Sequence, residues 1–173
     1  MVEPPRSLFD LLGQAARRFD LLLIGGFALQ AYGVVRQTLD VDCITTESDE
    51  TTLQEMLVGA GFSRLARTEN FARFRHNMLG QLDVLFVDTS TFAQMRAASK
   101  SYNIGQIAFG VPALSHLIGL KLHAIKNDPM REPRDLSDIV ELVRQNSFST
   151  EELHGLCGRF GPPGIWEKLR QYV

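Results

Sequence analysis

The fold is best read from one stretch of the chain, Arg36-Gln37-Thr38-Leu39-Asp40-Val41-Asp42-Cys43-Ile44. In a β-strand, this stretch would present Leu39, Val41 and Cys43 on one face and Arg36, Thr38, Asp40 and Asp42 on the other. Two carboxylates two residues apart on one face repel each other, and divalent cations with oxygen ligands neutralise such a pair well. The alternative is a solvated strand edge or turn, which is the commoner setting of a lone D-x-D.

An apolar run of strand length precedes this stretch and ends in a glycine pair, Leu21-Leu22-Leu23-Ile24-Gly25-Gly26. A segment of helical character follows at 27–32. Exposed N–H groups and the helix dipole make a glycine turn at a helix start a phosphate site. Gly25 and Gly26 alone indicate this weakly, because any tight turn uses glycine, and no G-K-[ST] follows as in a P-loop.

A third carboxylate lies inside an apolar strand-like run, Gln81-Leu82-Asp83-Val84-Leu85-Phe86-Val87. Leu85 and Val87 share the face of Asp83, so this face is expected to be largely covered. An unpaired acid there would be costly, and Asp83 should therefore have a partner. A metal shared with Asp40 and Asp42 would supply one, and together with the glycine turn this favours the metal interpretation of the D-x-D.

Composition limits the class of protein without identifying its chemistry. The chain has 173 residues, of which 45% are hydrophobic, and a formal net charge of −2. The charge argues against a generally basic nucleic-acid surface, and two distant cysteines exclude a thiol zinc site. No apolar stretch approaches the roughly 20 residues that span a bilayer. We expect a cytoplasmic protein with no membrane partner.

The remaining patterns predict an α+β fold, a small mixed β-sheet flanked by helices with a helical C-terminal part. Strands are expected over 20–24, 34–45, 62–68, 71–76, 81–87 and 104–109. Helices are expected over 7–19, 27–32, 49–60, 91–99, 113–126, 134–145, 150–160 and 165–172. Ser149 with Glu152 predicts a capping box for the helix over 150–160.

Two charged residues stand out in the helical part. Lys121 falls within the apolar stripe of the helix over 113–126, where its ammonium either snorkels to water or points at an anion. Asp135 flanks the apolar stripe of the next helix, where it orients Lys121 or Arg134, or is simply an acid favoured by the helix dipole. Asp138 is expected to point further from that stripe.

A local excess of positive charge lies between Gly61 and Leu79, in Arg64, Arg67, Arg73 and Arg75. Arg73 and Arg75 share a strand face. A solvated hairpin is favoured over a patch that binds RNA or another anion.

Together these residues resemble a known family. Gly25-Gly26-Phe27-Ala28, then Arg36-x-Thr38-x-Asp40-x-Asp42, then a strand with Asp83, resembles the nucleotidyltransferases of the polymerase-β superfamily. Lys121-x-x-Ala124 and Arg134-Asp135-Leu136-Ser137-Asp138-Ile139 are similar to a segment of the small bacterial branch related to the AbiEii abortive-infection proteins. The resemblance covers residues 20 to about 143. One departure is Gly26, since many members carry a serine there.

The resemblance implies a nucleotidyltransferase catalytic core over 1–110, with a helical region over 111–173 packed on it. It implies two Mg²⁺ ions, or Mn²⁺ in their place, bound by Asp40, Asp42 and Asp83. The nucleotide site would comprise Gly25, Gly26, Arg36, Thr38, Lys121 and Asp135. Catalysis would rest on Asp40, Asp42, Asp83 and Lys121. The reaction would transfer a nucleoside monophosphate from an NTP to an acceptor and release pyrophosphate.

The acceptor stays open at this point: RNA, as in toxin-like members, a protein or a small molecule. One alternative is a non-catalytic binding protein on the same fold, partnered by an antitoxin protein in a toxin–antitoxin or defence pair. The presence of all three carboxylates argues against it. Another alternative is an antibiotic adenylyltransferase, which needs an acidic pocket for a cationic substrate. The arginine cluster disfavours that reading.

Overall fold

The structure is a computed structural model that describes residues 7–173, so residues 1–6 of the predicted core range lie outside the described part. The described chain divides into two compact units. The first, which we call the sheet unit, comprises the described residues up to Phe27 together with Gln37–Pro112. The second, the helical unit, comprises Ala28–Arg36 and Ala113–Val173. The segment between the glycine turn and the acidic strand therefore groups with the C-terminal helices.

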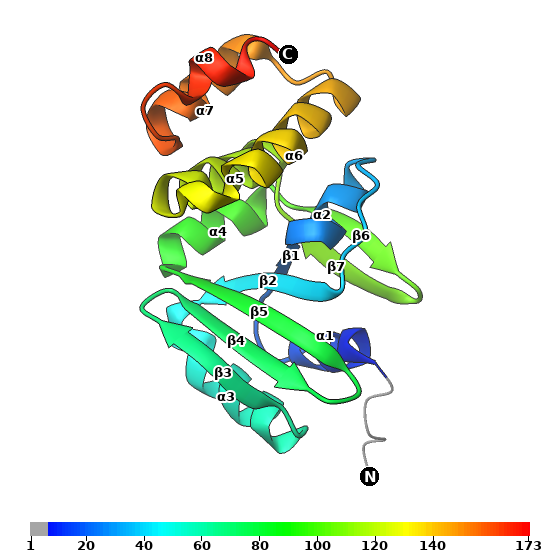
Figure 1. Ribbon diagram of the computed structural model, residues 1–173. Helices are drawn as coiled ribbons and strands as arrows, with labels where there is room; N and C mark the ends of the chain where they lie inside the picture. The colour runs from blue at the N-terminus through cyan, green and yellow to red at the C-terminus, as the bar shows by residue number, and fades with distance from the viewer. Residues whose placement is uncertain (1–6) are drawn as a thin grey trace. The chain divides into compact units, whose positions relative to one another are not determined.

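The sheet unit is built on one seven-stranded mixed sheet with the order β3-β4-β5-β2-β1-β7-β6 (Figure 1). Its strands are β1 (Leu22–Ile24), β2 (Asp40–Thr46), β3 (Ser63–Thr68), β4 (Phe71–His76), β5 (Gly80–Val87), β6 (Lys100–Ile104) and β7 (Ile107–Val111). The pairs β2–β5 and β1–β7 are parallel, and the other neighbours are antiparallel. The predicted small mixed sheet is confirmed.

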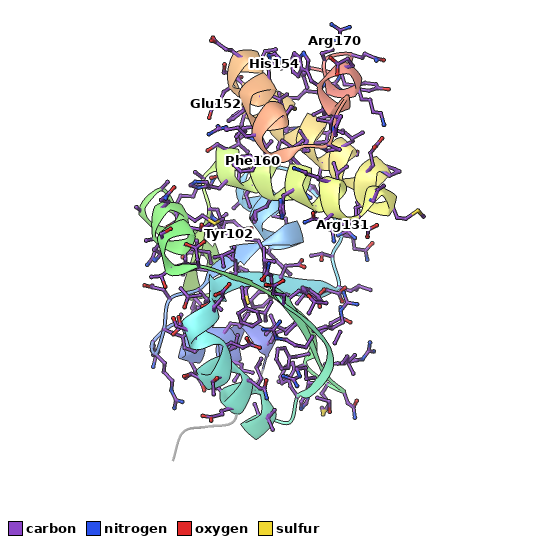
Figure 2. All side chains as sticks on the ribbon, turned by 90° about the vertical axis from the view of Figure 1, so that its left-hand side faces the viewer. Tyr102, Arg131, Glu152, His154, Phe160 and Arg170 are labelled. Carbon is purple, nitrogen blue, oxygen red and sulfur yellow. The ribbon has the colours of Figure 1, made fainter. Side chains whose placement is uncertain are left out.

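Helices bury one face of this sheet. The helices of the unit are α1 (Leu8–Ala15), the short η1 (Glu47–Asp49), α3 (Glu50–Gly59) and α4 (Thr89–Ala97). Figures 1 and 2 agree that α1 and α3 lie on the same side of the sheet. Strand alternation sends Cys43, Phe74 and Val84 into the core. Their neighbours along each strand, which include Asp42 and Asp83, therefore lie on the opposite face of the sheet.

Two predicted strands differ from the observed ones. The acidic strand begins at Asp40 rather than at residue 34, because α2 (Gly25–Ala31) is followed by a turn at Gly33, with φ +80°, and the chain then continues as a loop. The strand predicted over 104–109 is instead a hairpin of β6 and β7. Gly105, with φ +60°, forms its tight turn, and the sequence signal for this turn is the Gly-Gln pair between two isoleucines.

The helical unit is held by an apolar core of its own. It contains the end of α2 (Gly25–Ala31), α5 (Leu114–Asn127), η2 (Pro129–Arg131), α6 (Glu132–Gln145), α7 (Thr150–Phe160) and α8 (Ile165–Leu169). Leu29, Leu122, Ile139 and Leu153 are among the buried residues where these helices meet. The Ser149 hydroxyl accepts from the Glu152 N–H at 3.3 Å, so the Ser149 half of the predicted capping box of α7 is confirmed. Across residues 7–173, no helix combines the length and the apolar character that crossing a bilayer requires.

Candidate functional site

The glycine turn and the acidic strand meet in the sheet unit. β1 ends at Ile24, which pairs with Asp42 on β2, and α2 begins at Gly25. Gly25 has φ +62°, and a Cβ there would lie 2.0 Å from Oδ2 and 2.8 Å from Cβ of Asp42. Only glycine is compatible with both the backbone conformation and this approach. The first turn of α2 is thereby held against the Asp42 carboxylate.

Thr38 explains why the turn carries glycine twice. A Cβ at Gly26 would lie 2.7 Å from Cβ and 2.8 Å from Cγ2 of Thr38, so a serine side chain has no room there. The Thr38 hydroxyl donates to the carbonyl of Asp40 at 2.9 Å. The structure thus brings together Gly26, Thr38 and Asp40, three of the residues that the sequence singled out.

The acids gather on one face of two neighbouring parallel strands. Asp42 on β2 and Asp83 on β5 occupy facing positions in the register, and Asp40 lies on the same face two residues before Asp42. Cys43 points the other way, into the core. Burial raises the pKa of the Cys43 thiol far above its usual range, and the nearby charges of Asp42 and Asp83 add to the effect. The thiol therefore stays protonated and inert.

The partner of Asp83 is Arg73, which sequence reasoning missed. Arg73 on β4 faces Asp83 and donates from Nε to Oδ1 at 2.9 Å and from Nη2 to Oδ2 at 2.7 Å. Gln81 adds a bond to Oδ1 at 3.2 Å. These bonds to Asp83 raise the pKa of Arg73, and the charges of Asp83, Asp40 and Asp42 reinforce the shift against the effect of burial. The signal lay in the β4–β5 hairpin, where both residues are equally far from the turn.

The donor set fits a hard divalent cation, although no ready-made cluster is present. Within residues 7–173, no three or more His, Cys, Asp or Glu side chains are arranged to hold a metal ion. Asp40 and Asp42 offer the carboxylate oxygens that Mg²⁺ and Mn²⁺ prefer, and Mg²⁺ commonly takes one or two carboxylates with substrate phosphates and water. Both oxygens of Asp83 already accept from Arg73, so a metal bound by Asp83 would either share the carboxylate with the guanidinium or displace it.

A buried ion network occupies the helical unit. Lys121 on α5 donates from Nζ to Asp135 at 2.9 Å and to Asp138 at 2.6 Å, both on α6. Arg131, labelled in Figure 2, donates to the other oxygen of Asp135 at 2.9 Å. Arg36 donates to Asp138 at 2.5 Å. The side chain of Asp135 is 0% exposed and that of Asp138 is 9% exposed. Both carboxylates are therefore buried, and the lysine and arginine partners neutralise their charges.

This network changes the interpretation of three predicted residues. Asp135 does orient Lys121, and although burial would raise the pKa of Asp135, the Lys121 and Arg131 cations outweigh it and lower that pKa. The expectation for Asp138 is wrong: it lies three residues after Asp135 and four before the buried Leu142, on the same helix face. Arg36 binds Asp138 rather than extending β2. Contact of Lys121, Arg36 or Asp135 with a nucleotide stays a prediction.

Two of the four arginines of the cluster pair with carboxylates within the sheet unit. Arg64 donates to Gln54 and Arg67 to both oxygens of Glu50, on α3. Arg73 is held by Asp83. These contacts favour the solvated hairpin that the sequence suggested.

Several solved nucleotidyltransferases have a similar fold. The solution structure of the antibiotic-resistance factor ANT(2″)-Ia is similar with a TM-score of 0.66 at 16% identity, covering 93% of this chain and 91% of that chain. The lincomycin-bound lincosamide antibiotic adenylyltransferase LnuA gives 0.56 at 15% identity, covering 78% and 93%. A putative nucleotidyltransferase from Thermotoga maritima gives 0.53 at 12% identity, covering 72% and 85%.

Sequence comparison adds no closer assignment. The chain matches no protein-family model and no curated protein. Identities this low carry the fold and not the reaction. None of the similar structures points to the AbiEii-like branch in particular. The mixed sheet with its flanking helices therefore gives this chain the same fold as these nucleotidyltransferases.

Proposed function

We propose that the protein is a metal-dependent nucleotidyltransferase that transfers a nucleoside monophosphate from an NTP to an acceptor. One observation carries the proposal: the close approach of the Gly25 turn to Asp42, beside Asp40. A turn whose N–H groups suit phosphate and a carboxylate pair that suits divalent cations then belong to a single site. A polyphosphate bound with Mg²⁺ is the ligand that uses both features.

The residues of the sheet unit have distinct parts in such a reaction. An acceptor oxygen attacks the α-phosphorus, the bond to the pyrophosphate oxygen breaks, and pyrophosphate leaves with that electron pair. The turn at Gly25 and Gly26 would orient the β- and γ-phosphates, and Asp40 and Asp42 would hold Mg²⁺ or Mn²⁺. A bound ion would neutralise charge on the attacking and leaving oxygens. Asp83, once released from Arg73, would accept the proton of the acceptor.

A small-molecule hydroxyl is the acceptor class that two observations favour. Among the similar structures, ANT(2″)-Ia is found in complex with adenylyl-2″-tobramycin, and LnuA is named a lincosamide adenylyltransferase. The arginine cluster argued against a cationic substrate, but two of its four charges are paired with Glu50 and Asp83, which weakens that argument. An RNA or protein acceptor and an antitoxin partner rest on the sequence pattern alone.

The proposal is tested by measuring the transfer of label from an α-labelled NTP to candidate acceptors. Purified protein is incubated with Mg²⁺ and each α-labelled NTP, together with aminoglycosides and lincosamides, total RNA or cell protein. We expect label in one pool and release of pyrophosphate, both abolished by EDTA. Asp40→Asn and Asp42→Asn should each reduce the rate at least about a hundredfold, as loss of charge stabilisation at a transition state does.

The matched control is Glu55→Gln, which removes an exposed carboxylate from α3 of the same unit and should leave the rate unchanged. Label that still reaches an acceptor in the double variant of Asp40 and Asp42 would disprove the assigned site. Absence of label in every pool, together with no binding of any NTP, would disprove the function.

A further inference from the structure

The Arg73–Asp83 pair lies where the proposed metal site needs a third carboxylate. Each oxygen of Asp83 accepts one N–H of the Arg73 guanidinium, at 2.9 and 2.7 Å, and the two residues face each other across β4 and β5. The Asp83 side chain is 12% exposed, whereas that of Arg73 is 41% exposed. The acid is therefore fixed, and the arginine has access to water on release.

We propose that Arg73 is an internal cation that competes with divalent metal for Asp83, and so sets the metal affinity of the site. The inference rests on the proposed function, because it assigns the competing ion to the site at Asp40 and Asp42. A two-pronged guanidinium–carboxylate pair is a strong and directional hydrogen-bonded contact. A metal ion bound by Asp83 would lie beside the guanidinium charge, and the two cations would repel each other unless that contact is given up. Arg73 is thus a positioning residue and not a catalytic one.

The register strengthens the argument. Asp83 faces Arg73 on one side and Asp42 on the other, since β5 lies between β4 and β2. Without Arg73, Asp83 would face Asp42 with no guanidinium partner, and the two negative charges would repel each other. A variant without Arg73 should therefore be less stable than the natural protein when no metal is bound. Its affinity for a divalent cation should be higher. A merely structural arginine would produce the first effect without the second.

The experiment measures Mn²⁺ binding without nucleotide, by calorimetry and by the electron paramagnetic resonance signal of free Mn²⁺. Arg73→Gln should bind Mn²⁺ about five- to tenfold more tightly than the natural protein, the range expected for loss of one partly exposed competing ion pair. Mn²⁺ should also raise the thermal midpoint of Arg73→Gln more than that of the natural protein. Arg73→Lys keeps the charge but not the fork, and should tighten binding by a smaller factor.

Arg75→Gln is the matched control, because it removes the same charge from the same strand face at an exposed position opposite Gln81. It should change the affinity less than about twofold. The gain from Arg73→Gln should also vanish in an Asp42→Asn background, which locates the ion.

Several results would overturn the proposal. These are Mn²⁺ affinity unchanged or weakened in Arg73→Gln, an equal gain in Arg75→Gln, or no Mn²⁺ binding by any variant. If Arg73→Gln does not fold, the affinity of Arg73→Lys decides in the same way. Failure of the proposed function would look different, because Mn²⁺ binding needs neither an NTP nor an acceptor.

Discussion

Asp135→Ala should lower the free energy of unfolding by about 3 kcal/mol, at the lower end of the range for breaking a buried ion pair. Asp135 is completely buried and accepts from both Lys121 and Arg131. The variant leaves the Lys121 ammonium, which is only 12% exposed, with Asp138 as its remaining partner. Arg131 loses less, because it is close to half exposed and turns to water.

Urea unfolding measures this loss, and Glu132→Ala provides the control. Glu132 belongs to the same helix, and its partner Lys168 is mostly exposed. An ion pair of that kind contributes up to about 1 kcal/mol. Equal losses in the two variants would show that the network around Lys121 does not hold the helical unit together.

The same network predicts a pH dependence with a definite sign. The cations Lys121 and Arg131 outweigh burial and keep the pKa of Asp135 below its ordinary value of 3.8. A carboxyl group with a lowered folded-state pKa contributes its stability above the unfolded value and loses it as the pH falls through the folded value. The stability difference between the natural protein and Asp135→Asn should therefore be constant near neutral pH and shrink below about pH 4. Urea midpoints across this range measure it.

Gly25→Ala should lower the free energy of unfolding by about 2–4 kcal/mol and abolish nucleotide binding. The added methyl group would lie 2.6 Å from Cγ and 2.8 Å from Cβ of Asp42. Rotation of the carboxylate does not relieve the contact with Cβ, so the turn or β2 must shift. Either movement would separate the N–H groups that we propose bind phosphate from the acidic pair.

Gly105→Ala is the control for Gly25→Ala, because it introduces alanine at a positive φ without a clash against a neighbouring residue. Gly105 has φ +60°, nearly the same as Gly25, but no atom lies within 4 Å of its added Cβ. This variant should lose only about 1 kcal/mol, the cost of a left-handed conformation in alanine, and should keep nucleotide binding. Thermal unfolding and nucleotide titration of the two variants make the comparison. Similar losses of binding in both would contradict the assigned role of the turn.

Local patterns were sufficient to predict much of the sheet unit. Alternation placed β4 at Phe71–His76 as observed and put Asp40 and Asp42 on one strand face, while the Ser149 cap marked the start of α7. These features depend on neighbours in sequence, through side-chain period and capping. The fold class could be predicted because the expected strands and helices together are typical of an α+β fold with a mixed sheet.

Most of what could not be predicted depends on how one element contacts another. Arg73 pairs with Asp83 only through the β4–β5 register, which is set by the hairpin and not by either strand alone. Arg36 was predicted to belong to a strand, but it binds Asp138 in the helical unit. Asp138 was predicted to lie away from the apolar stripe of α6. It is in fact on the buried face, one helical turn before Leu142, so that face is wider than the apolar residues alone indicate.

The central claim is that Asp40 and Asp42 hold a metal–nucleotide complex against the Gly25 turn. Its most direct test is calorimetric titration of non-hydrolysable analogues of the four NTPs, with Mg²⁺ or with EDTA, into the natural protein and the Asp40→Asn/Asp42→Asn variant. The account predicts that at least one analogue binds in the presence of Mg²⁺. It also predicts that binding weakens at least about tenfold with EDTA or in the variant, because the charge that the ion bridges is lost. Equal affinity under all these conditions, or no binding of any analogue, would contradict it.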